Sequence, residues 1–145
     1  MAGIQQHDSV WFPIVAVPSA ARTANGNLVI NGLGWAKQGL FLFDLTNAAT
    51  LVGDTLDVFV DLSPDEGVTY LNAVHFTQRL GNGADSLKEW AFLNPTHTGT
   101  ATIDVSTDAA AGAIRQIGLT DPFRVRWVIV GTGTFTFSVK AFLHS

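Results

Sequence analysis

The sequence predicts an all-β protein, a single-domain antiparallel β-sandwich that is jelly-roll-like and has about eight or nine strands. Short segments rich in β-branched and aromatic residues recur through the 145 residues, and turn-forming residues separate them. Of the 12 acidic residues only Glu66 and Glu89 are glutamates, and the others are aspartates, which favour turns over helix surfaces. No long segment has the apolar spacing of a helix, so two packed sheets are the expected architecture.

Turn signals set the limits of the strands along the chain. The clearest breaks are Ala24–Asn27, Ser63–Gly67, Gly81–Gly83 and Thr120–Pro122. The predicted strands between these breaks are Val10–Val17, Leu28–Asn31, Leu40–Thr46, Thr55–Leu62, Asn72–Arg79, Thr100–Thr107, Ile114–Leu119, Arg124–Val130 and Thr134–Leu143.

Two further segments carry specific expectations. Asp85–Phe92 is predicted to form a short helical turn, because its first residues can cap a helix and Glu89 supports the first turn. Phe123–Gly131 and Thr134–Leu143 are long apolar runs joined by a Gly-Thr-Gly sequence. We expect these two runs to pair as a hairpin at the centre of a sheet.

Alternation along the strands predicts which residues face the core. In Thr55–Leu62, leucine and valine residues alternate with Asp57, Phe59 and Asp61, which point the other way. Three strands also have apolar residues on the face that should be outside, which predicts burial against a partner. The residues expected at such an interface are Phe41, Phe43, Phe59, Arg124, Arg126, Val128 and Val130.

A low charge density limits the classes of function. Charged residues make up 14% of the chain, against about 25% in typical soluble domains, and the formal net charge is −4. This composition predicts that partner subunits cover part of the surface. The eight basic residues form no stripe, which argues against nucleic-acid binding. No apolar run reaches the roughly 18 residues of a membrane helix, and cysteine is absent, so no disulfide forms.

The length predicts one domain over residues 10–145, large enough to bury roughly 70% of its unfolded surface. Residues 1–9 are polar and are either an N-terminal arm that becomes ordered on a partner or a frayed terminus. They lack a basic segment followed by an apolar stretch, so we expect no signal peptide.

The sequence presents no convincing catalytic, metal or cofactor site, so we expect a protein that is not an enzyme. The weak metal candidates are Asp57, Asp61 and Asp65, because calcium prefers oxygen ligands in flexible loops. Their spacing does not match an EF-hand, and aspartate is common in turns. Asp57 and Asp61 would lie about 13 Å apart on an extended strand, too far for a glycosidase pair. The four histidines are scattered, without metal-ligand spacing.

Carbohydrate binding is a further alternative, because β-sandwich modules use exposed aromatic residues as platforms for sugar rings. The chain has four tryptophans, Trp11, Trp35, Trp90 and Trp127. A flat platform needs two or three aromatic residues on one outer face, and the sequence does not show such a row.

The segment Gly53–Gln78 (GDTLDVFVDLSPDEGVTYLNAVHFTQ) resembles a pattern in small structural proteins of tailed bacteriophages. In these proteins a T-L-D-V-x-V strand leads into a Ser-Pro-Asp-x-Gly turn, and the return strand ends in A-x-x-H/R-F-T-Q. The terminal FRVRWVIVGTGTFTFSVKAFL is similar to the strands that close the same proteins, and both segments together cover about a third of the chain. The turn Asp65–Tyr70 differs from the commoner Gly-Gly-Thr-Thr-Trp type, so a role for its aromatic residue does not carry over.

The resemblance implies a bacteriophage virion component, with a capsid decoration (cement) protein that self-associates and stabilises the head as the leading function. The partners then expected are the protein itself, as a homotrimer or other cyclic oligomer, and the major capsid protein, with neither nucleic acid nor membrane involved. The expected location is the virion, after assembly in the host cytoplasm. A phage tail-tube, connector or collar protein remains an alternative, although the chain shows no convincing long hairpin arm.

Overall fold

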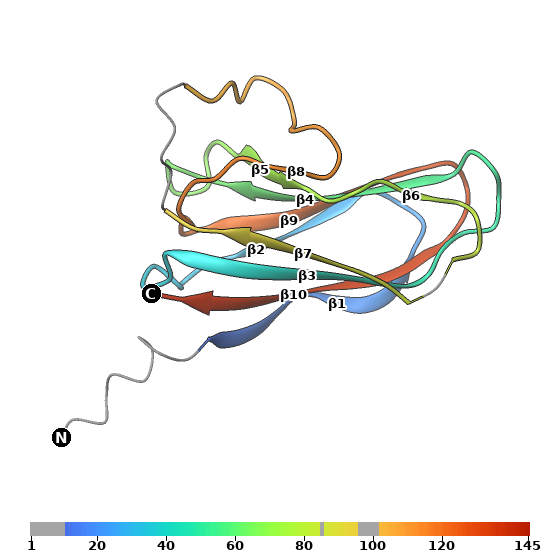
Figure 1. Ribbon diagram of the computed structural model, residues 1–145, viewed down its shortest axis with the longest axis horizontal. Helices are drawn as coiled ribbons and strands as arrows, with labels where there is room; N and C mark the ends of the chain where they lie inside the picture. Colours follow the sequence, from blue (N-terminus) through green and yellow to red (C-terminus); the bar gives the residue numbers. More distant parts are fainter. Residues whose placement is uncertain (1–10, 85, 96–101) are drawn as a thin grey trace.

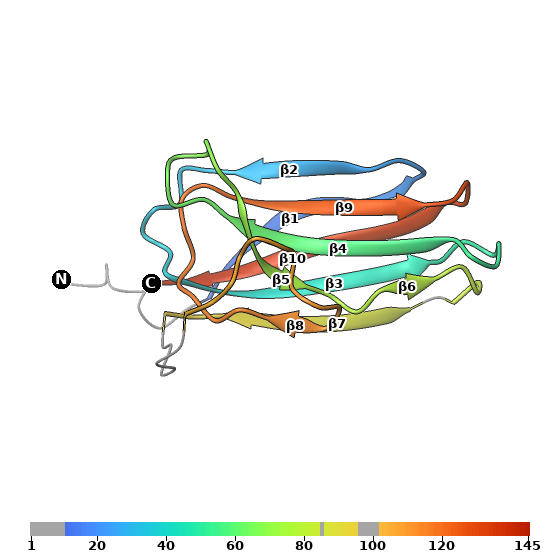
Figure 2. The same cartoon turned by 90° about the horizontal axis from the view of Figure 1, so that it is seen from above.

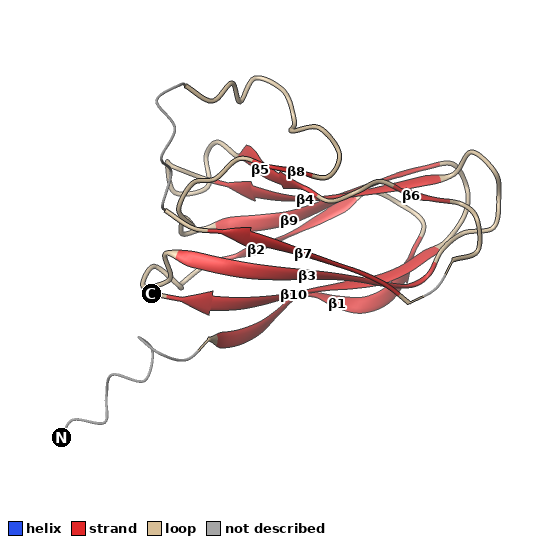
Figure 3. Cartoon of the chain, viewed as in Figure 1, coloured by secondary structure: helices blue, strands red, loops and turns tan. Residues whose placement is uncertain are grey.

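The structure is a computed structural model that describes residues 11–84, 86–95 and 102–145. Its described part contains ten strands and no helix (Figures 1 and 3). In chain order the strands are β1 (Phe12–Arg22), β2 (Gly26–Ile30), β3 (Gln38–Asn47), β4 (Thr55–Leu62), β5 (Leu71–His75), β6 (Arg79–Leu80), β7 (Leu87–Leu93), β8 (Ala113–Ile114), β9 (Phe123–Val130) and β10 (Phe135–His144).

The strands form two antiparallel sheets that pack face to face (Figure 1). One sheet has four strands in the order β1-β10-β3-β7. The other has six, in the order β2-β9-β4-β5-β8, and the short β6 also pairs with β4. Without the two-residue strands β6 and β8, the remaining eight strands have the order of a jelly roll. The predicted all-β sandwich is therefore confirmed.

The core between the sheets follows the predicted two-residue alternation. Every second residue of β10 from Phe135 to Leu143 is fully buried, and so are the inward leucine and valine residues of β4. Phe137 packs edge-on against Trp127 of β9 and Phe43 of β3, with ring centroids 5.8 and 5.9 Å apart. Side chains from both sheets therefore interlock into one core.

The final two strands do not pair with each other, so the predicted hairpin is wrong. β9 lies between β2 and β4 in the six-stranded sheet, and β10 lies between β1 and β3 in the other. The connection over residues 131–134 crosses from one sheet to the other (Figure 2). Each strand has one wholly apolar face, and the two faces meet across the core instead of lying side by side, as the contact of Trp127 with Phe137 shows.

The predicted helical turn at Asp85–Phe92 is also wrong, because Leu87–Leu93 forms strand β7. β3 offers an open edge, and β7 pairs with it from Leu45 opposite Leu87 to Gly39 opposite Leu93. This ladder satisfies backbone groups that a single helical turn would leave open. Ala91 and Leu93 are buried while Trp90 points outward, which is strand alternation.

Two strands on the six-stranded sheet are shorter than predicted. The predicted strand Asn72–Arg79 divides into β5 and β6, and Ile114–Leu119 is reduced to the two residues of β8. The first strand is instead longer and continues past Val17 to Arg22, since register shifts against β10 carry the chain around Pro18.

The predicted strand Thr100–Thr107 is not found over residues 102–107, which form a loop. Residues 100 and 101 lie outside the described residues, and so does the proposed N-terminal arm, residues 1–9.

Candidate interaction surface

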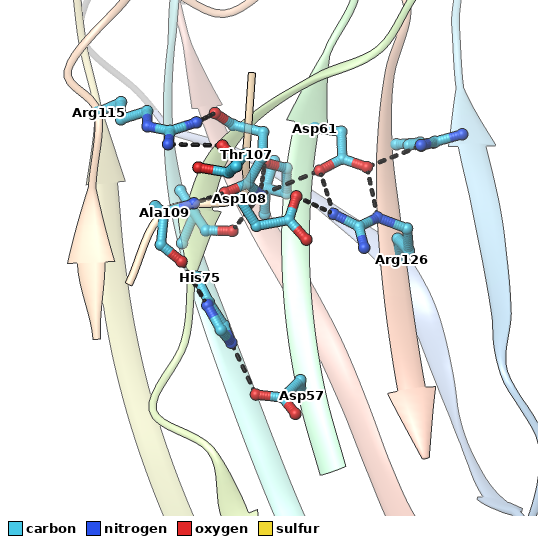
Figure 4. Close-up of polar contacts among 12 residues, drawn as sticks. Asp57, Asp61, His75, Thr107, Asp108, Ala109, Arg115 and Arg126 are labelled. Atoms are coloured by element: carbon cyan, nitrogen blue, oxygen red, sulfur yellow. Dashed lines mark hydrogen bonds and ion pairs between the residues drawn. The ribbon is translucent and has the colours of Figure 1, made fainter. Parts of the chain in front are cut away.

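The outer face of the six-stranded sheet carries a buried ion cluster centred on Asp61 of β4. This carboxylate, 1% exposed, accepts hydrogen bonds from Arg124 Nε at 2.8 Å, Arg126 Nε at 2.8 Å and Asn72 Nδ2 at 3.0 Å (Figure 4). The ladders place Arg124 directly opposite Asp61 and Arg126 directly opposite Phe59. Burial alone raises the pKa of Asp61, but hydrogen bonds from Arg126, Asn72 and Arg124 outweigh it, so the pKa lies below its usual value.

Residues 102–112, which we call the strap, are fastened over this cluster (Figures 1 and 4). Asp108 pairs with Arg126 at 2.9 Å, and the backbone of Ala109 donates to Asn72 Oδ1 at 2.8 Å. Arg115, just beyond the strap, donates to the carbonyl of Thr107 at 2.6 Å. The strap therefore shields part of this face from solvent, and the cluster that holds it is structural.

His75 of β5 links the strap to β4. Its Nδ1 lies 2.7 Å from the Ala109 carbonyl oxygen, and its Nε2 lies 2.7 Å from Asp57 Oδ1 (Figure 4). Its ring also stacks on Phe59, with centroids 4.2 Å apart. Both ring nitrogens therefore face oxygen atoms of the protein, and these contacts hold the ring between the strap and β4.

The three metal candidates do not form one site. Asp57 contacts His75 and accepts from Gln78, Asp61 holds the two arginines, and Asp65 caps its own turn by accepting from Thr69 N–H at 2.7 Å. No group of three or more histidine, cysteine or acidic side chains in the described part of the chain could hold a metal ion.

Most of the residues expected at a partner interface lie in the core or in the Asp61 cluster and not on an exposed apolar surface. Phe41 and Phe43 are in the core with no exposed surface, so they cannot contact a partner. Phe59 is buried between His75 and the guanidinium of Arg126, 3.9 Å above its ring. The remaining expected residues divide as follows: Arg124 and Arg126 belong to the Asp61 cluster, Val128 is half-buried, and Val130 is exposed.

The outer face of the four-stranded sheet is instead apolar, and none of the described strands packs over it (Figure 1). Two rows of cross-strand neighbours run over it, one from Pro13 to Phe92 and one from Val15 to Trp90. A shallow groove of about 370 Å³ lies between β1 and β10 on this face. The set that we call the apolar face consists of Trp11, Pro13, Val15, Leu40, Leu42, Trp90, Phe92 and Phe142.

Aromatic residues cluster on the apolar face. Trp90 is 54% exposed and its ring centroid lies 5.9 Å from that of Phe142, while Trp11 meets Phe92 edge-on at 5.8 Å. Sequence reasoning missed this cluster because it placed Trp90 in a helical turn. The signal that could have found it is Phe142, which breaks the alternation of its strand by placing an aromatic ring outside.

No protein-family model, curated protein or solved structure matches this chain. Within the described residues no helix is long and apolar enough to cross a membrane.

Proposed function

We propose that this protein is a non-enzymatic structural component of a bacteriophage virion, a capsid decoration (cement) protein that self-associates and stabilises the head. The observation that carries the proposal is the apolar face of the four-stranded sheet, over which no described strand packs. Monomeric soluble proteins rarely expose contiguous apolar patches beyond a few hundred Å², and larger ones mark interaction sites.

The fold and the resemblance to phage proteins support the same proposal. Jelly rolls are a recurrent architecture of viral capsid domains, although a fold by itself does not determine function. The matching segment Gly53–Gln78 spans β4 and β5, and the second segment spans β9 and β10. These segments supply central strands of both sheets, so the resemblance lies in the scaffold and not in an added loop.

The test is to locate the protein in purified virions of the phage that encodes it. Mass spectrometry of gradient-purified particles should find it at high copy number, and immunogold labelling should decorate the head, with the major capsid protein as the labelled reference. Labelling along the tail or at the neck would assign it to a tail-tube, connector or collar role instead. Absence from purified virions would contradict the whole proposal.

A second candidate, a carbohydrate-binding module, is favoured by one observation. Trp90 and Phe142 place two aromatic rings next to each other on the apolar face, with centroids 5.9 Å apart and planes inclined at 49°, where the sequence showed no aromatic row. Titration with oligosaccharides should then quench tryptophan fluorescence in the native chain but not in Trp90→Phe. Without saturable quenching this candidate is excluded.

A further inference from the structure

We infer that Asn31 is a deamidation site, at which the backbone nitrogen of Gly32 attacks the side-chain amide of Asn31 and the carboxylate of Asp121 takes the proton. The site modifies itself, and its product is aspartate or isoaspartate at position 31. This inference is independent of the proposed virion role. The argument comes from the different surroundings of three Asn-Gly pairs.

The three Asn-Gly pairs of the chain are Asn25-Gly26, Asn31-Gly32 and Asn82-Gly83. Glycine has no Cβ to hinder its nitrogen from approaching the preceding side chain, so ring closure is easiest at such a pair. All three asparagines are exposed, so access to solvent does not distinguish them. Their hydrogen bonds do distinguish them.

Hydrogen bonds restrain the reacting groups of two of the pairs. Asn25 Oδ1 accepts a hydrogen bond from the backbone N–H of Ile129 at 2.7 Å, which fixes this side chain to β9. Asn82 Oδ1 accepts one from a backbone N–H two residues further on, at 3.1 Å. In the same pair Gly83 N–H donates to the carbonyl oxygen of Ala49 at 2.9 Å, and a carbonyl oxygen is too weak a base to take the proton.

The surroundings of Asn31 favour the reaction. Its side chain forms no hydrogen bond with the described residues, so it can turn toward the nitrogen of Gly32. Gly32 N–H donates to Asp121 Oδ1 at 2.9 Å. Asp121 is exposed and makes no ion pair within the described part of the chain, so its carboxylate can act as a general base.

The fold holds Asp121 at this turn. Ile30 lies opposite Phe123 in the ladder of β2 and β9, which brings together the segments that follow β2 and precede β9. A Cβ on Gly34 would lie 3.2 Å from Asp121 Oδ2, so glycine there lets the chain approach the carboxylate closely. The N–H bond lies in the peptide plane, whereas the nitrogen attacks perpendicular to it, so the hydrogen bond leaves the path to Asn31 open.

The reaction needs only water as a co-reactant. A bond forms between the nitrogen of Gly32 and Cγ of Asn31, and the proton of this nitrogen passes to Asp121. The bond from Cγ to the side-chain nitrogen breaks, and this nitrogen leaves as ammonia with the proton from Asp121. Water then opens the succinimide ring at either carbonyl carbon.

The modification changes the end of an edge strand. β2 is the outermost strand of its sheet, and the contact of Gly32 with Asp121 ties the segment after it to the start of β9. Either product places a second negative charge beside Asp121, and like charges repel. Isoaspartate also adds one carbon atom to the main chain. The contact is therefore weakened irreversibly as the protein ages.

Peptide mapping of the full-length chain during prolonged incubation tests the inference. Trypsin cuts after Arg22 and Lys37, so Asn25 and Asn31 lie in one fragment and their conversion is compared in the same spectra. In the folded chain we expect Asn31 to react at least about tenfold faster than Asn25 and Asn82. In denaturant the three should react at similar rates. Equal rates in the folded chain, or a preference for Asn31 that persists in denaturant, overturn the inference.

The variant Asp121→Asn removes the base and keeps a hydrogen-bond acceptor of similar shape. It should slow the conversion of Asn31 by at least about tenfold. The matched control Asp104→Asn removes an exposed carboxylate of the strap and should leave this conversion unchanged. Asn25 and Asn82 report on folding, because both would react faster in an unfolded variant. Unchanged or faster conversion of Asn31 in folded Asp121→Asn overturns the inference, since the hydrogen bond would then only protect Gly32.

Discussion

Asp61 is the residue that holds the outer layer of the six-stranded sheet together, because two arginines and an asparagine converge on one buried carboxylate. Removing one member of a buried ion cluster leaves the others charged and unpaired. We therefore expect Asp61→Asn to lower the free energy of unfolding by about 3–5 kcal/mol, measured by denaturant titration. Asp108→Asn, on the exposed edge of the same cluster, should cost no more than about 1 kcal/mol. Equal losses for the two variants would contradict this account.

The lowered pKa of Asp61 makes stability depend on pH in the acid range. The pKa of Asp61 in the folded protein lies below its ordinary value of 3.8. The ionised carboxylate therefore contributes its full stabilisation at pH values above 3.8, and this contribution is lost as the pH falls through the pKa of the folded state. The native chain should therefore lose stability more steeply than Asp61→Asn below about pH 4. Parallel stability–pH curves for the two proteins would show that Asp61 does not titrate in this way.

Substitutions at two glycines can distinguish the stability cost of backbone strain from that of steric overlap. Gly53 and Gly131 have φ of +98° and +101°, but a Cβ on Gly53 would meet nothing within 4 Å, whereas one on Gly131 would overlap the buried Asp54 carboxylate. Gly53→Ala should cost about 1 kcal/mol in unfolding free energy from the left-handed conformation alone. Gly131→Ala should cost about 1–3 kcal/mol more, because an overpacked site must shift. Similar losses would rule out steric overlap as the cause.

At the scale of elements, the strap depends on a few polar contacts with side chains of the sheet. Its Ala109 peptide donates to Asn72 and its carbonyl oxygen faces His75. Asn72→Leu removes that acceptor and should greatly increase amide exchange of Ala109 and its neighbours, followed by hydrogen–deuterium exchange. Asp104→Asn weakens the two hydrogen bonds that Asp104 accepts within the strap, from the backbone N–H and the hydroxyl of Ser106, and should leave the exchange of Ala109 unchanged. Uniform faster exchange in both variants would mean that the strap is held by other contacts.

The elements that sequence patterns predicted well are those whose alternation decides their position. β4, β9 and β10 have one apolar face each, and their limits differ by no more than one residue from those predicted. β7 was missed because the acidic cap and Glu89 favour a helical start locally, whereas the open edge of β3 decides the conformation. No local pattern could distinguish a β9–β10 hairpin from a crossing between sheets, because both bury the same faces.

The candidate site was less predictable than the fold. The Asp61 cluster combines Asn72, Arg126 and Asp108 from separate segments of the chain. Their contacts arise only when the fold brings these segments together on one face, so no local pattern predicts them. The sequence did indicate an apolar outer surface, but it assigned Phe41 and Phe43 to that surface although they face the core. A strand that is apolar on both faces predicts burial on both sides, but it does not show which side faces the core.

For the molecule as a whole, the two outer faces differ in their exposed tryptophans, so fluorescence quenching can report on the apolar face. The strap covers part of one face, while the other exposes Trp90 and Trp11, and Trp127 is 7% exposed in the core. Acrylamide should quench a large part of the emission in dilute solution, and this part should shrink as concentration rises and the apolar face is covered. Trp90→Phe should remove most of the concentration dependence. Quenching independent of concentration in the native chain would contradict burial of this face.

The place of β10 between β1 and β3 has a consequence for synthesis. β10 is the last of the ten strands to leave the ribosome, yet it is an inner strand of its sheet. Until it emerges, β1 has no neighbour in that sheet, and the row from Val15 to Trp90 is not assembled. Nascent chains on the same messenger RNA therefore do not yet present a complete apolar face to one another. The strand order thus delays association through this face until β10 has been made.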